Sequence, residues 1–344
     1  MRITEKYVLK ELVPVFLVGN LFFIFILLID KIVDLSELIL AKNVPFFFVA
    51  ELIIAYIPSF LVITIPTSTL LSALIVYGRL SDDSELVAMK SLGADKYNIF
   101  KPSILLGFIS LVLALLMSLY LMPKGNDFAI ERLMQISKYV SINDFKENEL
   151  YTEIPGFVLY TDKRVDKNKF LGLIIINKKD HIVIQAKKGE IVNTTEGSLV
   201  FNLDNGVLID TKGEIPSKLE FKSFVVNVPI ITEKKFDVRN ERLMSIRNLI
   251  NHLNKSNIIK FELSKRFALP FASIIMAIFG AVVGSFFHRG GKAFGLSVSI
   301  IIVLIYNTLL LLSQNLINML NPYLAAWVAN IIFIILLVYL LRRA

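Results

Sequence analysis

The sequence predicts a polytopic α-helical membrane protein in which six transmembrane helices, three and three, flank an inserted all-β domain. Two observations predict this class: long apolar runs toward both ends of the chain, and a charged, strand-patterned stretch between them. Six apolar runs cover residues 13–29, 52–76, 104–121, 267–287, 294–312 and 324–341. About 18 apolar residues are enough to cross a hydrocarbon layer about 30 Å thick. Composition agrees, because 55% of the residues are hydrophobic and only 19% are charged.

The first apolar run is expected to be retained as a helix. It is too long for the apolar part of a secretory signal, and no small-residue cleavage site follows it. Lysine and arginine then set the orientation, because they gather in short cytoplasmic loops. They are frequent at both termini and after the second and fourth runs, whereas the other short loops hold only Lys31 and Lys42. The sequence therefore predicts cytoplasmic termini and a middle domain on the outer side, which is the periplasm in a cell with two membranes.

The middle domain is expected to be built from strands. Apolar residues alternate with period two at 157–161, 182–186 and 224–228, and turn-forming residues separate such runs at intervals of about 8–12 residues. This spacing predicts an antiparallel sandwich or a barrel-like sheet. Helices are expected on either side of it, at 127–138 and 244–255.

The chain is thereby divided into three parts. An N-terminal membrane half covers residues 1–123, the middle domain 124–263, and a C-terminal membrane half 264–344. The middle domain has no nucleophile paired with a base, and its histidines, His181 and His252, are far apart in sequence. A binding or scaffold module is therefore expected there.

Several functions are excluded by what the chain lacks. It has no cysteine, which excludes disulfides, thiolate nucleophiles and cysteine metal sites. Its net charge of +8 does not indicate nucleic-acid binding, because much of the excess flanks the apolar runs. Lys292 follows two glycines, but Phe286 and Ala293 occupy positions where a phosphate-binding loop needs Gly and Ser or Thr. His288 has no second ligand nearby. We expect no ATP site, metal or other cofactor in this chain, and no enzymatic activity.

A short amphipathic helix is predicted in the cytoplasmic loop after the second apolar run, at about 81–93. Ser81 or Asp82 is expected to cap its start, and Gly93 its end. Two interpretations stay open: an ordinary interfacial connector, or a helix that docks into a groove on a cytoplasmic ATPase. Acidic residues around its apolar positions favour a protein partner over an anionic lipid surface.

The segment SELVAMKSLGA, residues 84–94, resembles the coupling-helix motif of the lipopolysaccharide-export permeases, the LptF/LptG family of ABC transporter subunits. The resemblance extends over the whole chain, with three spans, a periplasmic domain and three spans. It includes ELSKR at 262–266 and GKAFGLS at 291–297. The family resemblance implies that the middle domain is a β-jellyroll and that the chain lies in the bacterial inner membrane. Both the F and the G paralogue fit the sequence.

The resemblance also implies partners and a transport cycle. A second permease subunit, homologous or identical, and a dimeric cytoplasmic ABC ATPase that binds ATP and magnesium would complete the transporter. It would extract lipopolysaccharide, or a similar phosphorylated glycolipid, and pass it to a periplasmic bridge of LptC/LptA-like jellyroll proteins. In the family the glutamate of the coupling helix is a main ATPase contact, which is Glu85 here. Leu86, Met89 and Gly93 would shape the same docking face.

Lys31 stands at the outer end of the first apolar run, with Asp34 one turn further on. One interpretation is a lysine that anchors a helix end at the interface. In family members, however, a lysine at this position faces a cavity and meets the phosphorylated head of the lipid. Phosphates need a cation, and acyl chains need an apolar wall. Lys31 is therefore predicted to bind substrate, with Lys42 and Arg266 as further contacts, although Arg266 is also placed to pair with Glu262.

Two other classes compete with a lipid exporter. A mechanotransmission or lipoprotein-release-type permease would be driven by an ATPase without exporting lipid directly, but such proteins usually have four spans. An intramembrane enzyme would need ionisable groups inside its spans. The cores of the six apolar runs contain no His, Asp, Glu, Lys or Arg, which argues against the enzyme.

Overall fold

The computed structural model describes residues 3–40, 44–143, 145–152, 154, 156–166, 168–195, 198–212, 216–229, 241, 244–286 and 291–343. The chain divides into two compact units. The first, called here the helical unit, contains Met1–Ile32, Ile53–Asp127 and Arg239–Ala344. The second, the sheet unit, contains Val33–Leu52 and Phe128–Val238.

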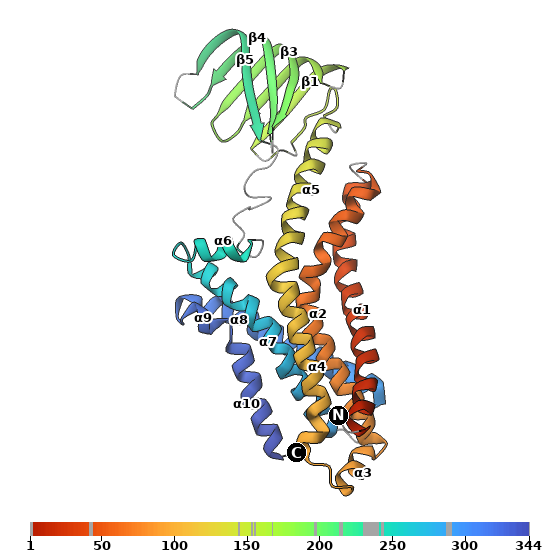
Figure 1. Cartoon of the computed structure of the whole chain (residues 1–344). Coiled ribbons are helices and arrows are strands. Elements are labelled where there is room, and N and C mark those ends of the chain that lie inside the picture. The colour runs from red at the N-terminus through yellow and green to blue at the C-terminus, as the bar shows by residue number, and fades with distance from the viewer. Residues whose placement is uncertain are drawn as a thin grey trace. The chain divides into compact units, whose positions relative to one another are not determined.

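Helices account for most of the described chain (Figure 1). They are α1 (Ile3–Leu40), α2 (Phe46–Asp82), α3 (Glu85–Ser91), α4 (Lys96–Leu116), the π-helical turn η1 (Met117–Leu121), α5 (Met122–Asn143), α6 (Ile246–Asn251), α7 (Asn257–Phe286), α8 (Gly291–Asn315), the 3-10 turn η2 (Leu316–Asn318), α9 (Pro322–Ala325) and α10 (Val328–Arg343). Both helices expected beside the middle domain are present, as α5 and as the shorter α6. The predicted boundaries after residues 123 and 263 fall inside α5 and α7.

Five helical segments in the described chain are long and apolar enough to cross a membrane. They are Ile3–Ser36, Phe46–Asp82, Tyr97–Leu133, Asn257–Phe286 and Gly295–Asn315. The last apolar run, 324–341, is interrupted, because α9 ends at Ala325 and a turn follows before α10 begins at Val328. What is left, Val328–Arg342, is a shorter apolar helix. The structure therefore confirms a helical, membrane-like protein with five such helices, and the sixth span stays a prediction.

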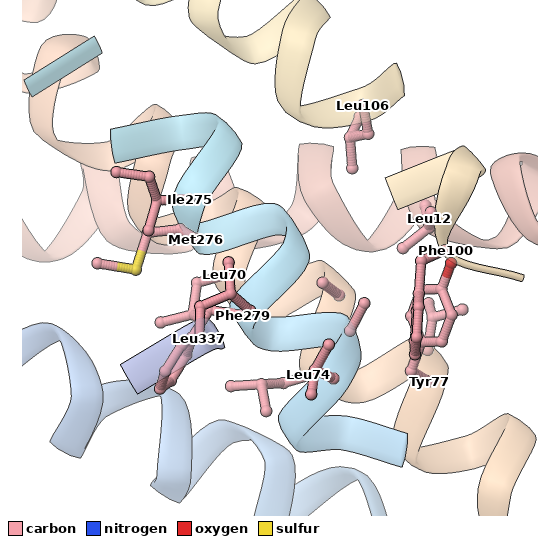
Figure 2. Close-up of a cluster of buried hydrophobic side chains, with 14 of the residues drawn as sticks. Leu12, Leu70, Leu74, Tyr77, Phe100, Leu106, Ile275, Met276, Phe279 and Leu337 are labelled. Carbon is pink, nitrogen blue, oxygen red and sulfur yellow. The ribbon is translucent and has the colours of Figure 1, made fainter. Parts of the chain in front are cut away.

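The core of the helical unit is packed around α7 (Figure 2). Side chains from α1, α2, α4, α7 and α10 meet there, among them Leu12, Leu70, Leu74, Tyr77, Phe100, Leu106, Ile275, Met276, Phe279 and Leu337. Glycines let the helices approach closely: a Cβ added at Gly107 would lie 2.7 Å from Ala277 Cβ, and one at Gly280 would lie 2.7 Å from the backbone oxygen of Leu70. Small residues at helix contacts are typical of membrane proteins, where close packing replaces the hydrophobic effect.

Among its described residues, the sheet unit contains one five-stranded antiparallel sheet in the order β1-β2-β3-β4-β5. The strands are β1 (Phe157–Asp166), β2 (Lys169–Asn177), β3 (Ile182–Thr195), β4 (Ser198–Asp210) and β5 (Ser217–Pro229). Its core includes Phe145, Phe170, Leu173 and Phe201. Each strand pairs with the next along the chain, which is a meander, whereas a jellyroll has two sheets joined by crossing connections. An inserted antiparallel sheet is confirmed, and the jellyroll form stays a prediction.

Candidate functional site

A cavity of about 410 Å³ lies in the helical unit, where α1, α2, η1, α5 and α7 meet. Its wall is partly apolar and partly polar. The apolar lining residues are Val62, Ile63, Met122 and Leu269, and the polar ones are Lys31, Tyr56, Ser59, Ser118, Asn126, Glu262, Lys265 and Arg266. A site with an apolar wall and a few convergent polar groups suits an amphiphilic ligand.

Two of the three predicted substrate contacts line this one cavity. Lys31 comes from α1 and is half-buried, and Arg266 comes from α7. The fold thus brings together two cations that are far apart in the sequence. Lys42, the third predicted contact, lies outside the described residues.

Arg266 is 2% exposed and is held by several groups. Its Nη2 donates hydrogen bonds to the backbone oxygens of Glu241 and Met244, in the segment that precedes α6. Its Nε lies 3.9 Å from Oε1 of Glu262, so the expected pairing with Glu262 is present. Two carbonyl oxygens of the segment before α6 and a carboxylate of α7 together hold the guanidinium.

Five further polar residues of the cavity are not among the sequence predictions: Tyr56, Ser59, Ser118, Asn126 and Lys265. Lys265 Nζ lies 3.5 Å from Oε2 of Glu262. Ser59 Oγ donates to Asn126 Oδ1 at 3.1 Å, and so joins α2 to α5. The pairing of Lys265 with Glu262 could be predicted from the sequence, because Lys265 is three residues after Glu262 on a helix. The pairing of Ser59 with Asn126 could not, because no local pattern links residues that far apart.

The backbone beside the cavity is irregular at two places. The π-helical turn η1 comes shortly before Pro123, whose ring excludes the usual helical contact with the preceding turn. Within α7, Pro270 has no N–H for the backbone oxygen of Arg266. Ser118 Oγ, in η1, donates to that oxygen at 2.9 Å. One hydrogen bond therefore joins the two irregular points, and π-helical turns are frequent at functional sites.

The predicted amphipathic helix is α3. Its C-terminal end agrees with the prediction from sequence, whereas its N-terminal end does not. It begins at Glu85 after Ser84, which has a left-handed backbone with φ 57° and makes no side-chain cap. The prediction that Ser81 or Asp82 caps it is wrong, because both belong to α2. Ser81 Oγ instead donates to the backbone oxygen of Ser285 at 3.1 Å.

The C-terminal end of α3 has the predicted glycine. Gly93 has φ 81°, its N–H donates to the Lys90 oxygen at 3.0 Å, and the Ala94 N–H donates to the Met89 oxygen at 3.0 Å. These two bonds form a Schellman motif, which needs a left-handed residue and therefore favours glycine. The structure confirms Gly93 as the residue that ends the helix.

Apolar side chains lie on two faces of α3. Leu86 is 6% exposed and belongs to the core of the helical unit, and Met89 packs against that core. Val87 is exposed and Leu92 is 86% exposed. Of the predicted docking residues, Leu86 and Met89 therefore face the protein itself, while Gly93 is exposed. The apolar surface that α3 offers to solvent is Val87 with Leu92.

Glu85 takes part in a polar cluster formed by Tyr7, Glu11, Arg79, Asp83 and Glu85, called here the Arg79 cluster. Arg79 Nη1 lies 3.2 Å from Glu85 Oε1 and 3.2 Å from Asp83 Oδ2. Arg79 Nη2 lies 3.5 Å from Glu11 Oε2 and donates to the Tyr7 hydroxyl at 3.1 Å. The Tyr7 hydroxyl in turn donates to Glu85 Oε1 at 3.3 Å. The cluster joins α1, α2 and the first residue of α3.

Comparison with known proteins identifies the family. The family model described as "Lipopolysaccharide export system permease LptF/LptG" matches residues 6–343. The chain is also 23% identical over 234 residues to "Uncharacterized protein RP871" of Rickettsia prowazekii (strain Madrid E). That alignment covers 66% of this chain and spans 64% of the relative's length. Because the family model covers the cavity, α3 and the inserted sheet alike, the chain belongs to the lipopolysaccharide export system permease family LptF/LptG.

Proposed function

We propose that this chain is a permease subunit of an ABC transporter that extracts lipopolysaccharide, or a similar phosphorylated glycolipid, from the inner membrane. Family membership supports the transport class. The observation that carries the proposal is the cavity, in which Lys31, Lys265 and Arg266 share one wall with apolar side chains. Phosphate groups bind to cations and acyl chains bind to apolar surfaces, so this lining matches both halves of the ligand.

The rest of the proposal concerns topology. Both termini and α3 would lie in the cytoplasm, and α10 would complete a sixth span. The sheet unit would lie in the periplasm as a jellyroll-like receiver, which hands the lipid to a bridge of LptC/LptA-like proteins. The lysine and arginine distribution supports this orientation.

Energy would come from a partner, because the sequence has no phosphate-binding loop. In the proposed complex this chain is not an enzyme; a dimeric cytoplasmic ATPase binds ATP and magnesium, and a second permease subunit completes the path. Glu85 would contact the ATPase from the start of α3. Val87 in α3 and Leu92 at its C-cap would add the apolar contact, since both are large apolar side chains that are exposed.

Photo-cross-linking from the cavity tests the proposal. A photoreactive phenylalanine analogue in place of Tyr56, which lines the cavity, should capture lipopolysaccharide when the complete transporter is embedded in nanodiscs, and ATP should reduce the yield. The matched control is the same analogue at Leu17, which is exposed on α1 and would meet bulk lipid. Equal capture at both positions, or capture that ATP does not change, would count against a lipid path through the cavity. That result would favour the lipoprotein-release-type alternative.

A further inference from the structure

The described lining of the cavity contains one carboxylate and three cations. Glu262 lines it together with Lys31, Lys265 and Arg266. The Glu262 side chain is 9% exposed, and its two oxygens are divided between two partners. Oε2 lies 3.5 Å from Lys265 Nζ, and Oε1 lies 3.9 Å from Arg266 Nε.

Helical spacing creates this arrangement. Residues three and four apart on a helix are neighbours on one face, so Glu262, Lys265 and Arg266 are presented together by α7. Both distances are long compared with the roughly 2.7–2.9 Å of a strong charge-assisted hydrogen bond. A carboxylate shared in this way holds neither cation in the best geometry, so an anion that fits better can replace it.

The two cations differ in how freely they can change partner. Arg266 is tied to the backbone oxygens of Glu241 and Met244, so its guanidinium positions the chain around the cavity. Lys265 is 18% exposed, and Glu262 holds its ammonium. An ammonium on a flexible stem binds phosphate as a point charge and reorients at little cost.

We infer that Glu262 is a built-in counter-ion that a lipid phosphate displaces, and that Lys265 is the cation which the displacement transfers to the phosphate. The inference rests on the proposed function and names Lys265 and Glu262 as residues that determine its specificity. Glu262 competes with the phosphate for Lys265, so it weakens binding and speeds release. A transporter needs that balance, because a lipid that binds too tightly is not handed on.

The test compares lipid A carrying two phosphates with lipid A from which both have been removed. Each is offered in nanodiscs to the complete transporter with the photoreactive analogue at position 56. Lys265→Gln should reduce capture of the phosphorylated lipid about tenfold, the change that about 1.4 kcal/mol produces. Glu262→Gln should raise that capture by a similar factor and slow its ATP-driven loss. Neither substitution should change capture of the dephosphorylated lipid.

Conservative variants and a free anion complete the test. Lys265→Arg keeps the charge and should restore the preference for the phosphorylated lipid. Should Lys265→Gln fail to assemble with the ATPase, Lys265→Met replaces it, since its chain has similar length without charge. Inorganic phosphate should not reduce capture at millimolar concentration; if it does, the ligand of Lys265 is free phosphate and the lipid assignment is overturned.

The outcomes separate this inference from the proposed function. An unchanged preference for phosphorylated lipid in both Lys265→Gln and Glu262→Gln would overturn the counter-ion role. Capture by the otherwise unmodified protein would still support the cavity as a lipid site. No capture from position 56 in that protein would overturn the proposed function itself.

Discussion

Two arginines of the helical unit, Arg266 beside the cavity and Arg79 beside α3, are surrounded in opposite ways. Arg266 is 2% exposed and bonds to backbone oxygens. The Arg79 side chain is 27% exposed and is shared among three carboxylates and the Tyr7 hydroxyl. Besides Glu262, the first arginine has two backbone oxygens as partners, which cannot turn away as a side chain can. The second has several partners on flexible side chains.

The two surroundings have different consequences for stability. Removing one partner of a buried charge pair leaves the other charge uncompensated and is strongly destabilising. An exposed ion pair contributes little, because water and salt screen it. The cavity is therefore anchored by Arg266, whereas the ion pairs of the Arg79 cluster add little to the stability of the helical unit.

The largest expected effect is that of Arg266→Ala. The substitution removes the donors that satisfy the backbone oxygens of Glu241 and Met244, and it leaves Glu262 with one cation fewer. Loss of a buried pair of this kind costs about 3–5 kcal/mol. The thermal midpoint of the purified protein in detergent should fall sharply, as followed by the loss of the monodisperse peak after heating. Arg79→Ala, measured beside it, is the control; an equal fall in both variants would remove the contrast between the sites.

A second comparison sharpens the contrast within α3 itself. Leu86→Ala should destabilise the protein by about 2–5 kcal/mol, because it leaves a cavity in a packed core. Leu92→Ala should change stability by less than about 0.5 kcal/mol, since an exposed side chain is removed. Co-purification with the ATPase should show the reverse order, with the larger loss for Leu92→Ala. If Leu92→Ala binds the ATPase normally, the exposed apolar face of α3 is not the docking surface.

Some of these features were predictable from sequence, for a local reason. Apolar runs predict helices because a backbone in hydrocarbon must satisfy its own hydrogen bonds. The end of α3 was predictable because Gly93 adopts a left-handed conformation that other residues disfavour. Strands were expected where apolar residues alternate, and all three of the alternating segments lie in β1, β3 and β5.

Other features depend on tertiary contacts and have no local signal. The helical spacing of apolar residues in α3 places Leu86 on its apolar face. The spacing does not show whether that face packs against the protein itself or against a partner. The start of α3 was placed too early, because α2 continues as one helix through Ser81 and Asp82. Neither the pairing of Ser59 with Asn126 nor the meander order of the strands has a sequence pattern that specifies it. Such features depend on which surfaces meet in the folded protein. The local periodicity of the sequence does not specify these contacts.

A small effect on stability is also expected for Arg79→Ala, and this variant is the most informative about coupling. Its ion pairs are partly exposed, so the free energy of unfolding should fall by no more than about 1 kcal/mol. Glu85 would lose its contact with α2 and keep the Tyr7 hydroxyl of α1. Movement of α3 would then be passed to α2 less efficiently, and the lipid released per ATP hydrolysed should fall severalfold in the reconstituted transporter, with ATP hydrolysis itself retained.

Two variants distinguish coupling from simple damage to the Arg79 cluster. Arg79→Lys keeps the charge but loses the planar fork that reaches several acceptors at once, so it should recover only part of the lipid-to-ATP ratio. Tyr7→Phe removes one hydroxyl and leaves the Arg79 ion pairs with Asp83 and Glu85 in place, so its ratio should stay close to that of the unmodified protein. If Arg79→Ala leaves the lipid released per ATP hydrolysed unchanged, the Arg79 cluster has no role in coupling. If α3 moves during the proposed transport cycle, a contact of low stability is the kind that it could make and break in every cycle.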